Sequence, residues 1–307
     1  MVGKEAARAP AGMKDRFRHF AGIDWSGAAG ERHKGIAIAM CSLDNEAPRL
    51  LNRPGKRWSR EDVLAFLLND LPEDTLVGLD LGISLPFADA GAFFPGWQHS
   101  PPTARDLWAL VDEICRPDPH LGATSFVDHP ELSRYFRRPG GREGDRFHLA
   151  DTGHKRGRFR ITEEAQAAAG CKPYSNFNLI GAAQVGKSSL TGMRMLHRLE
   201  GRISVWPVDP LPSAGSTIVE IYTALAAMAA GRTAARAKMN DIVALNNALA
   251  ALGSPIVKGS GTIDDHSADA LVTSAWLRNA ASTEELWSPC SLAPDIARTE
   301  GWTFGAR

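Results

Sequence analysis

The sequence predicts an α/β fold on a mixed five-stranded sheet, in the order β-β-β-α-β-α and flanked by helices. Three apolar segments separated by turn residues open the regular part of the chain, at 20–25, 35–41 and 49–58. Ser59 then precedes apolar residues at helical spacing, which is typical of a capped helix. A further apolar strand follows at 76–83. This order indicates an antiparallel meander whose central strand pairs in parallel with the strand after the helix.

The chain divides into an arm and one domain with an insertion. Residues 1–18 mix basic and small residues without an apolar run, so we expect a flexible N-terminal arm and no signal peptide. Residues 19–307 form the predicted single domain, and many prolines between about 87 and 201 indicate a long insertion of short helices and loops. Regular structure resumes with two strands and then three helices, expected at 203–208, 217–222, 224–230, 235–252 and 266–278.

Composition limits the possible classes of protein. With 307 residues, 44% of them hydrophobic, the chain can bury one large core or two ordinary ones. Its 35 basic residues balance its 35 acidic ones, so any nucleic-acid contact must come from a local patch. The four cysteines form no C-x-x-C pair, which disfavours a zinc site and indicates a reducing cytoplasm. No segment approaches the roughly 20 apolar residues that span a bilayer, so we expect no membrane partner.

Two acidic residues stand inside apolar strands. Asp24 lies in A-G-I-D-W-S-G and Asp80 in V-G-L-D-L-G. An ionised carboxylate is costly to bury without a countercharge. If the topology places these strands side by side, the two acids can share a divalent cation, because hard oxygen ligands suit Mg²⁺ or Mn²⁺. The alternative is that each aspartate only caps a turn at the end of its strand.

Further acids come later in the chain. Asp265 and Asp269 are four residues apart, so on a helix both project from one face, and negative charge is favoured in the first turn. Ordinary capping explains Asp265 equally well, whereas Asp269 lies deeper, where the apolar helix residues begin. Glu220, within I-V-E-I-Y, is a fourth ligand or a partner of one. Such a cage suits phosphodiester hydrolysis, in which two ions about 3.5 to 4 Å apart activate water and stabilise charge.

Five blocks of sequence, in order and over most of the chain, carry a resemblance to a known family. They are G-I-D-W-S-G (22–27), G-L-D-L-G-I-S-L-P (78–86), V-G-K-S-S-L-T-G (185–192), V-E-I-Y (219–222) and D-D-H-S-A-D-A (264–270). The chain resembles the RNase H-like superfamily, and more narrowly a family of predicted RNase H-like nucleases of unknown function. Similarity to resolvase-type members implies metal-ligand roles for Asp24, Asp80 and Asp269, with Asp265 or His266 nearby. The chain departs from those members at Asp80, where they commonly carry Glu.

A different motif favours nucleotide binding. The segment from Gly181 through Gly186, Lys187 and Ser188 fits the pattern G-x-x-x-x-G-K-[ST], in which backbone N–H groups and the lysine hold phosphates. The motif needs a buried strand just before it, and the preceding residues 175–180 are only weakly apolar. The alternative interpretation is a glycine-punctuated turn that leads into a helix.

The insertion also contains a basic stretch. Residues 134–160 hold nine Arg and Lys against three Asp and Glu, with aromatic residues interleaved. Such a stretch can follow phosphates and stack on bases, although a solvated loop is an equal alternative. The residues expected to bind nucleic acid are Arg137, Arg138, Arg142, Lys155, Arg156, Arg158 and Arg160.

Together these patterns predict a metal-dependent nuclease with Asp24, Asp80 and Asp269 as its catalytic acids. Two other classes stay open. One is a P-loop-type or actin-like phosphotransferase that binds ATP, and the other is a non-catalytic RNase H-like binding module.

Overall fold

The structure, a computed structural model, is built around a mixed β-sheet, and it describes residues 13, 15–44, 46–52, 55, 57–148, 156–181, 184–233 and 238–307. Its strands are β1 (His19–Asp24), β2 (Arg32–His33), β3 (Ala37–Ser42), β4 (Arg49–Leu50), β5 (Trp58–Ser59), β6 (Thr75–Asp80), β7 (Arg137–Arg138), β8 (Arg142–Glu143), β9 (Ser204–Trp206) and β10 (Thr217–Glu220). Its α-helices are α1 (Arg60–Ala65), α2 (Ala104–Ile114), α3 (Thr124–Asp128), α4 (Ile161–Ala168), α5 (Val185–Arg198), α6 (Thr223–Ala229), α7 (Ile242–Ala251), α8 (Asp265–Ala280), α9 (Glu284–Trp287) and α10 (Pro294–Thr299). Short turns of other helix types are η1 (Phe66–Asp70), η2 (Leu132–Tyr135) and η3 (Pro139–Gly141).

Among the described residues, the main sheet has six strands in the order β4-β3-β1-β6-β10-β9. β3 runs antiparallel to β1, whereas β6, β10 and β9 follow in parallel. The α/β class and the mixed sheet are therefore confirmed, but the expected count of five strands is wrong, because β9 adds a parallel edge. The segment 49–58 also differs from the expected strand, since of its described residues only those at its two ends lie in strands, and β5 pairs with β2 in a separate ribbon.

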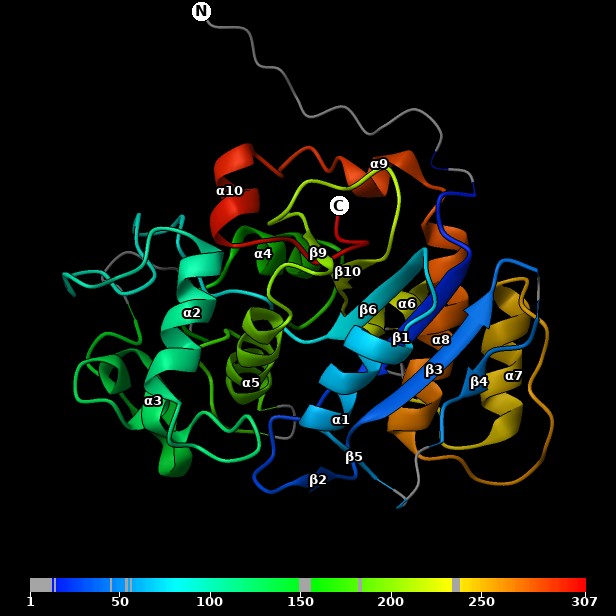
Figure 1. The fold of residues 1–307 in the computed structure, drawn as a ribbon, viewed down its shortest axis with the longest axis horizontal. Helices are drawn as coiled ribbons and strands as arrows, with labels where there is room; N and C mark the ends of the chain where they lie inside the picture. The colour runs from blue at the N-terminus through cyan, green and yellow to red at the C-terminus, as the bar shows by residue number, and fades with distance from the viewer. Residues whose placement is uncertain are drawn as a thin grey trace, which may run out of the picture.

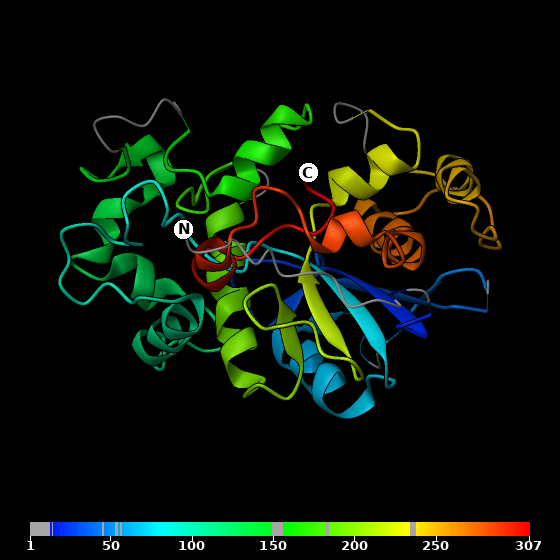
Figure 2. The ribbon, with the colours of Figure 1, turned by 90° about the horizontal axis from the view of Figure 1, so that it is seen from above.

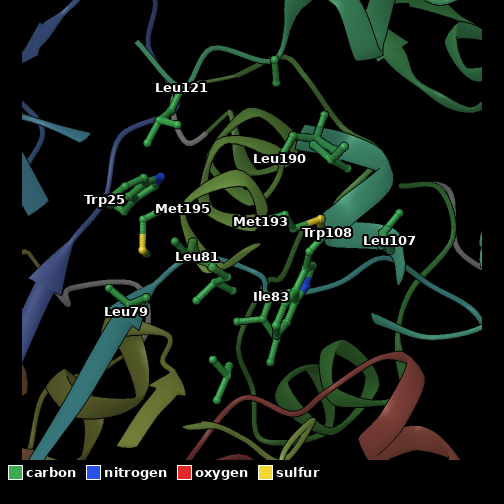
Figure 3. Packing of buried hydrophobic residues seen from close by; sticks show 14 of the residues in the cluster. Trp25, Leu79, Leu81, Ile83, Leu107, Trp108, Leu121, Leu190, Met193 and Met195 are labelled. Carbon is green, nitrogen blue, oxygen red and sulfur yellow. The ribbon is translucent and has the colours of Figure 1, made fainter. Parts of the chain in front are cut away.

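Helices cover both faces of the sheet (Figures 1 and 2). Alternate residues of β1 face opposite sides, as the strand period of two requires. Ala21 and Ile23 face a hydrophobic cluster with α1, α2 and α5, whereas Phe20 belongs to another cluster with α6, α7 and α8. Figure 3 shows the first of these clusters. Trp108 of α2 packs there, and its indole N–H donates to the carbonyl of Ile83 at 2.7 Å.

Helix α8 lies very close to β1, because glycine leaves room for it. A Cβ atom on Gly22 would lie 2.4 Å from the carbonyl oxygen of Ala270 in α8. On the neighbouring strand, a Cβ atom on Gly78 would lie 2.9 Å from Leu277 of the same helix. The two glycines therefore set the depth at which α8, with its acidic first turns, sits over the carboxyl ends of β1 and β6.

Residues near both ends of the chain pack into the core, although the sequence predicted a flexible arm at 1–18. Residues 1–12 and 14 of the expected arm lie outside the described residues. Met13 and Phe17, however, are buried in the cluster around α8, and Arg16 donates to the carbonyls of Pro212 and Gly215. The final segment of the chain also packs inward, with Trp302 buried. No helix among the described residues is long and apolar enough to cross a membrane.

Replacing Gly22 with alanine tests the close approach of α8. We expect Gly22→Ala to lower the free energy of unfolding by about 1 to 3 kcal/mol, as overpacking of a close-packed core does. The control is Gly35→Ala, whose added Cβ atom would lie no closer than 3.4 Å to its neighbours. Urea denaturation of both variants measures the difference, and equal stabilities would contradict this account of the packing.

Candidate active site

Two aspartates end adjacent parallel strands. β1 and β6 pair in register, so that Asp24 stands directly beside Asp80. Asp24 lies two residues after Gly22, and Asp80 lies two residues after Gly78. Their side chains are therefore on the same face of the sheet as these glycines, which is the face that α8 covers. This pairing confirms the expectation that the strands lie side by side.

Helix α8 brings further acids to the same place. The side chain of Asp264 caps its first turn by accepting from the N–H of Ser267 at 3.0 Å. Asp265 and Asp269 then follow one turn apart on the same face, as their spacing of four requires. Asp24, Asp80, Asp265 and Asp269 all line one cavity of about 420 Å³, which we call the acidic cavity.

The charges of these acids act on one another. Burial raises the pKa of Asp80 well above its usual range, and the negative charges of Asp24 and Asp269 raise it further. Burial, and then Asp24, raise the pKa of Asp269 to about 7. Burial also raises the pKa of Asp24, which a hydrogen bond from His266 partly opposes. The cavity therefore concentrates negative charge that the surrounding groups only partly balance.

Two cationic side chains orient Asp24 and Asp265. His266 Nδ1 lies 2.9 Å from Asp24 Oδ2, and this contact raises the pKa of His266 to about 8. Lys238 Nζ lies 2.6 Å from Asp265 Oδ2, and its hydrogen bond lowers the pKa of Asp265. Lys238 escaped the sequence analysis because it fell within the helix expected at 235–252, whereas α7 begins only at Ile242 and Lys238 stands in irregular chain before it.

The acids share a cavity without a preformed ligand cage. Within the described ranges, neither Asp80 nor Asp269 forms an ion pair. The same residues contain no group of three or more His, Cys, Asp or Glu side chains arranged to hold a metal ion. Oxygen atoms from these acids are nevertheless the donor type that Mg²⁺ and Mn²⁺ prefer.

Glu220 has a different environment from the aspartates. It pairs with Leu79 rather than with Asp80, so its side chain lies on the opposite face of the sheet, although it still reaches the wall of the acidic cavity. Arg160 donates to both carboxylate oxygens, at 2.6 and 2.8 Å, and the N–H of Ile83 and the hydroxyl of Thr303 donate as well. These bonds occupy Glu220 and give it a structural role, which differs from the ligand role considered from the sequence.

The G-x-x-x-x-G-K-S segment lacks the surroundings of a phosphate-binding loop. Of the residues just before Gly181, only Asn178 makes an isolated bridge, and the described part of 171–181 forms no strand. A Cβ atom on Gly27 would lie 2.3 Å from the backbone nitrogen of Ser188, so the β1 loop covers the start of α5. Ser188 lines the acidic cavity, whereas Lys187 lines another one. The two residues therefore do not face one common phosphate position.

The basic stretch of the insertion separates into buried and outer residues. Arg158 is fully buried and holds Asp89 through two hydrogen bonds of 2.6 and 2.8 Å. Arg160 is buried between Glu163 and Glu220. These two arginines fasten the insertion to the sheet, which corrects their expected role as surface contacts for phosphates. Of the others, Arg137 pairs with Glu143, Arg138 pairs with Asp128, Arg142 and Arg156 are exposed, and Lys155 lies outside the described residues.

Arg156 and Tyr174 form an outer wall near the acidic cavity. The guanidinium of Arg156 lies 5.1 Å from the centroid of the Tyr174 ring. Tyr174 is 46% exposed and lines the cavity together with Tyr222. An exposed aromatic ring beside an arginine provides a surface on which a base can stack.

Comparison with known proteins adds no relative. No protein-family model, no curated protein and no solved structure matches this chain.

The crowded carboxylates predict how stability depends on pH when metal is absent. A raised carboxyl pKa stabilises the folded protein at low pH, and for Asp269 this stability is lost as the pH rises from 3.8 to about 7. The stability from His266 is present below 6.5 and is lost as the pH rises through about 8. We therefore expect the melting temperature in EDTA to fall between about pH 5 and 8, and to fall less for Asp269→Asn. If the melting temperatures of the wild type and of Asp269→Asn fell equally with pH, this would contradict the crowding of negative charge in the cavity.

Glu220 and Asp80 should respond oppositely to loss of charge. Glu220→Gln removes a charged partner of buried Arg160, and such losses cost about 3 to 5 kcal/mol. Asp80→Asn relieves repulsion, so we expect the metal-free protein to become more stable. Thermal melts in EDTA measure both changes. A stable Glu220→Gln protein would mean that Glu220 is not part of the structural network.

Proposed function

We propose that this protein is a metal-dependent nuclease that hydrolyses phosphodiester bonds of nucleic acid in the acidic cavity. The observation that carries the proposal is the meeting of Asp24, Asp80 and Asp269 at one cavity wall, from two strand ends and one helix. Their mutually raised pKa values indicate a site that gains stability when a cation enters. A polyanionic substrate brought to such a site needs the same cation to neutralise it.

The donor set of the cavity fits Mg²⁺ or Mn²⁺. Asp24, Asp80 and Asp269 would hold the ions, with Asp265 at the outer edge. A bound divalent cation supplies an activated water and stabilises charge on the attacked and leaving oxygens. The protein itself holds the carboxylates in place at the carboxyl ends of β1 and β6 and on the first turns of α8. His266 orients Asp24 by its hydrogen bond of 2.9 Å, and Lys238 restrains Asp265.

The arrangement of strands supports an RNase H-like core for this proposal. β4, β3 and β1 form an antiparallel meander whose end strand β1, rather than the expected central strand, pairs in parallel with β6, and β10 follows β6 in parallel. β9 is an addition at the edge of that order. The acids stand at the carboxyl ends of the parallel strands, where ligands of open α/β sheets bind.

The surroundings of the motif at Gly181 favour a nuclease over an ATP-dependent phosphotransferase. Its lysine and serine line different cavities, and Gly27 packs on the backbone that a phosphate-binding loop would present. A non-catalytic binding module would not need three carboxylates in one wall, because each raises the free energy of the metal-free fold.

The central test replaces Asp24. Asp24→Asn keeps the shape of the side chain and removes its charge, so we expect cleavage to fall at least about a hundredfold, since even outer-shell partners of a metal cost 10–100-fold. Magnesium or manganese should raise the melting temperature of the wild type more than that of the variant, because a ligand stabilises the state that binds it.

The control for this test is Asp44→Asn, which makes the same change at an exposed position. Cleavage is measured on single-stranded, duplex and branched substrates, with DNA and RNA forms of each. Unchanged cleavage by Asp24→Asn, together with equal metal-induced shifts, would show that Asp24 is only a turn residue and that the proposal is wrong.

A further inference from the structure

A second cavity adjoins the acidic one. It has a volume of about 260 Å³. The residues that line it include Gly27, Ala28, Arg60, His120 and Lys187. We call it the basic cavity. Gly27 and Ala28 line both cavities, so the loop after β1 forms the wall between them. At Gly27 this wall packs directly on the start of α5, where a Cβ atom would lie 2.3 Å from the backbone nitrogen of Ser188.

Arg60 supplies a buried positive charge to the basic cavity. Only 1% of the residue is exposed, and its guanidinium donates to the carbonyl oxygens of Ser26, Ala28 and His120. Within the described part of the chain, no carboxylate lies at ion-pairing distance from it. Its hydrogen bonds are therefore satisfied by carbonyl groups, and the neighbouring carboxylate of Glu61 acts on its charge only from beyond ion-pairing distance. A buried charge without an ion-pair partner favours an anion nearby.

Lys187 adds a positive charge that can reach a ligand. It stands in the first turn of α5, is half-buried, and lines the basic cavity. It forms no ion pair with any of the described residues. Among the residues that the structure describes, the lining holds one carboxylate, Asp118, against the two cationic side chains of Arg60 and Lys187. Both oxygens of Asp118 accept from Ser125 at 2.7 Å. The cavity therefore presents a net positive lining.

We propose that the basic cavity binds a backbone phosphate of the same nucleic-acid strand whose neighbouring phosphodiester lies in the acidic cavity. This inference rests on the proposed function. The strand passes over the loop at Gly27 and Ala28, which line both cavities, with Lys187 contacting its phosphate and Arg60 adding positive charge from within. The lysine of the G-x-x-x-x-G-K-S segment thus serves a polynucleotide rather than a nucleoside triphosphate. The two cavities together orient the strand and fix which bond meets the carboxylates.

The test measures binding without cleavage. A fluorescein-labelled single-stranded hexanucleotide with nuclease-resistant phosphorothioate linkages is titrated in magnesium, with fluorescence anisotropy recorded over a series of salt concentrations. We expect Lys187→Gln to weaken binding about tenfold, as loss of a hydrogen bond to a charged group does. The dependence of log affinity on log salt should become shallower by about 0.7, the value for one phosphate contact on a single strand. Lys187→Arg keeps the charge and should keep most of the affinity.

The matched control is Lys258→Gln, which removes an exposed lysine outside the basic cavity. Affinity that falls equally for Lys258→Gln, or stays unchanged for Lys187→Gln, would overturn the proposal. Loss of ATP binding by Lys187→Gln with unchanged affinity for the oligonucleotide would overturn it too, in favour of a mononucleotide site. Melting curves of the variants establish that each is folded.

A kinetic measurement separates this inference from the proposed function. In the metal-loaded enzyme, Lys187→Gln should raise KM with little change in kcat, because the lysine contacts a phosphate that does not react. If the protein cleaves nothing while Lys187→Gln still weakens binding specifically, the proposed nuclease activity falls and the phosphate site stands. If cleavage is robust and Lys187→Gln changes neither affinity nor KM, the activity stands and the phosphate site falls.

Discussion

The parallel pairing of β1 with β6 is the constraint on which the rest of the site depends. In-register pairing puts Asp24 beside Asp80, and glycines one pleat earlier let α8 descend until its first turns face both acids. None of the three aspartates alone has enough neighbours to bind a cation. Their joint position follows from backbone hydrogen bonds and from the absence of two Cβ atoms. Charge repulsion among the acids is thus imposed by the fold rather than relieved by it.

A network of buried ion pairs and hydrogen bonds anchors the long insertion to the rest of the fold. Arg160 forms ion pairs with Glu163 and Glu220. Arg158, two residues earlier, forms an ion pair with Asp89. Glu300, near the C-terminus, accepts from the N–H groups of Phe87, Ala88 and Ile161. Buried charges of this kind are tolerated because each has partners on several sides. They join chain segments more than a hundred residues apart, and Arg160, Glu163 and Glu220 of this network also line the acidic cavity.

The two cavities give the molecule an uneven charge that its neutral total conceals. Aspartates from the sheet and α8 line one side of the loop after β1, and Arg60 and Lys187 line the other. A polyanion that spans both meets fixed positive charge at one phosphate and needs a cation at the next. Under the proposed function, such an arrangement would favour an extended strand over a single phosphate, since a single phosphate can occupy only one of the cavities.

The sequence by itself determined the α/β class, the main strands and helix α8, because the periods of apolar residues and the capping residues are local signals. It also singled out Asp24, Asp80 and Asp269, since a charge inside an apolar run stands out without any knowledge of contacts. Only the tertiary structure decided which acids share a cavity and which are occupied. Glu220 resembles the aspartates in sequence, yet its register with Leu79 turns it to the other face, and register depends on pairing between distant strands. Arg158 and Arg160 likewise read as surface charge, whereas burial beside carboxylates from remote segments makes them structural. Local patterns report what a residue prefers, and long-range packing decides which partner it meets.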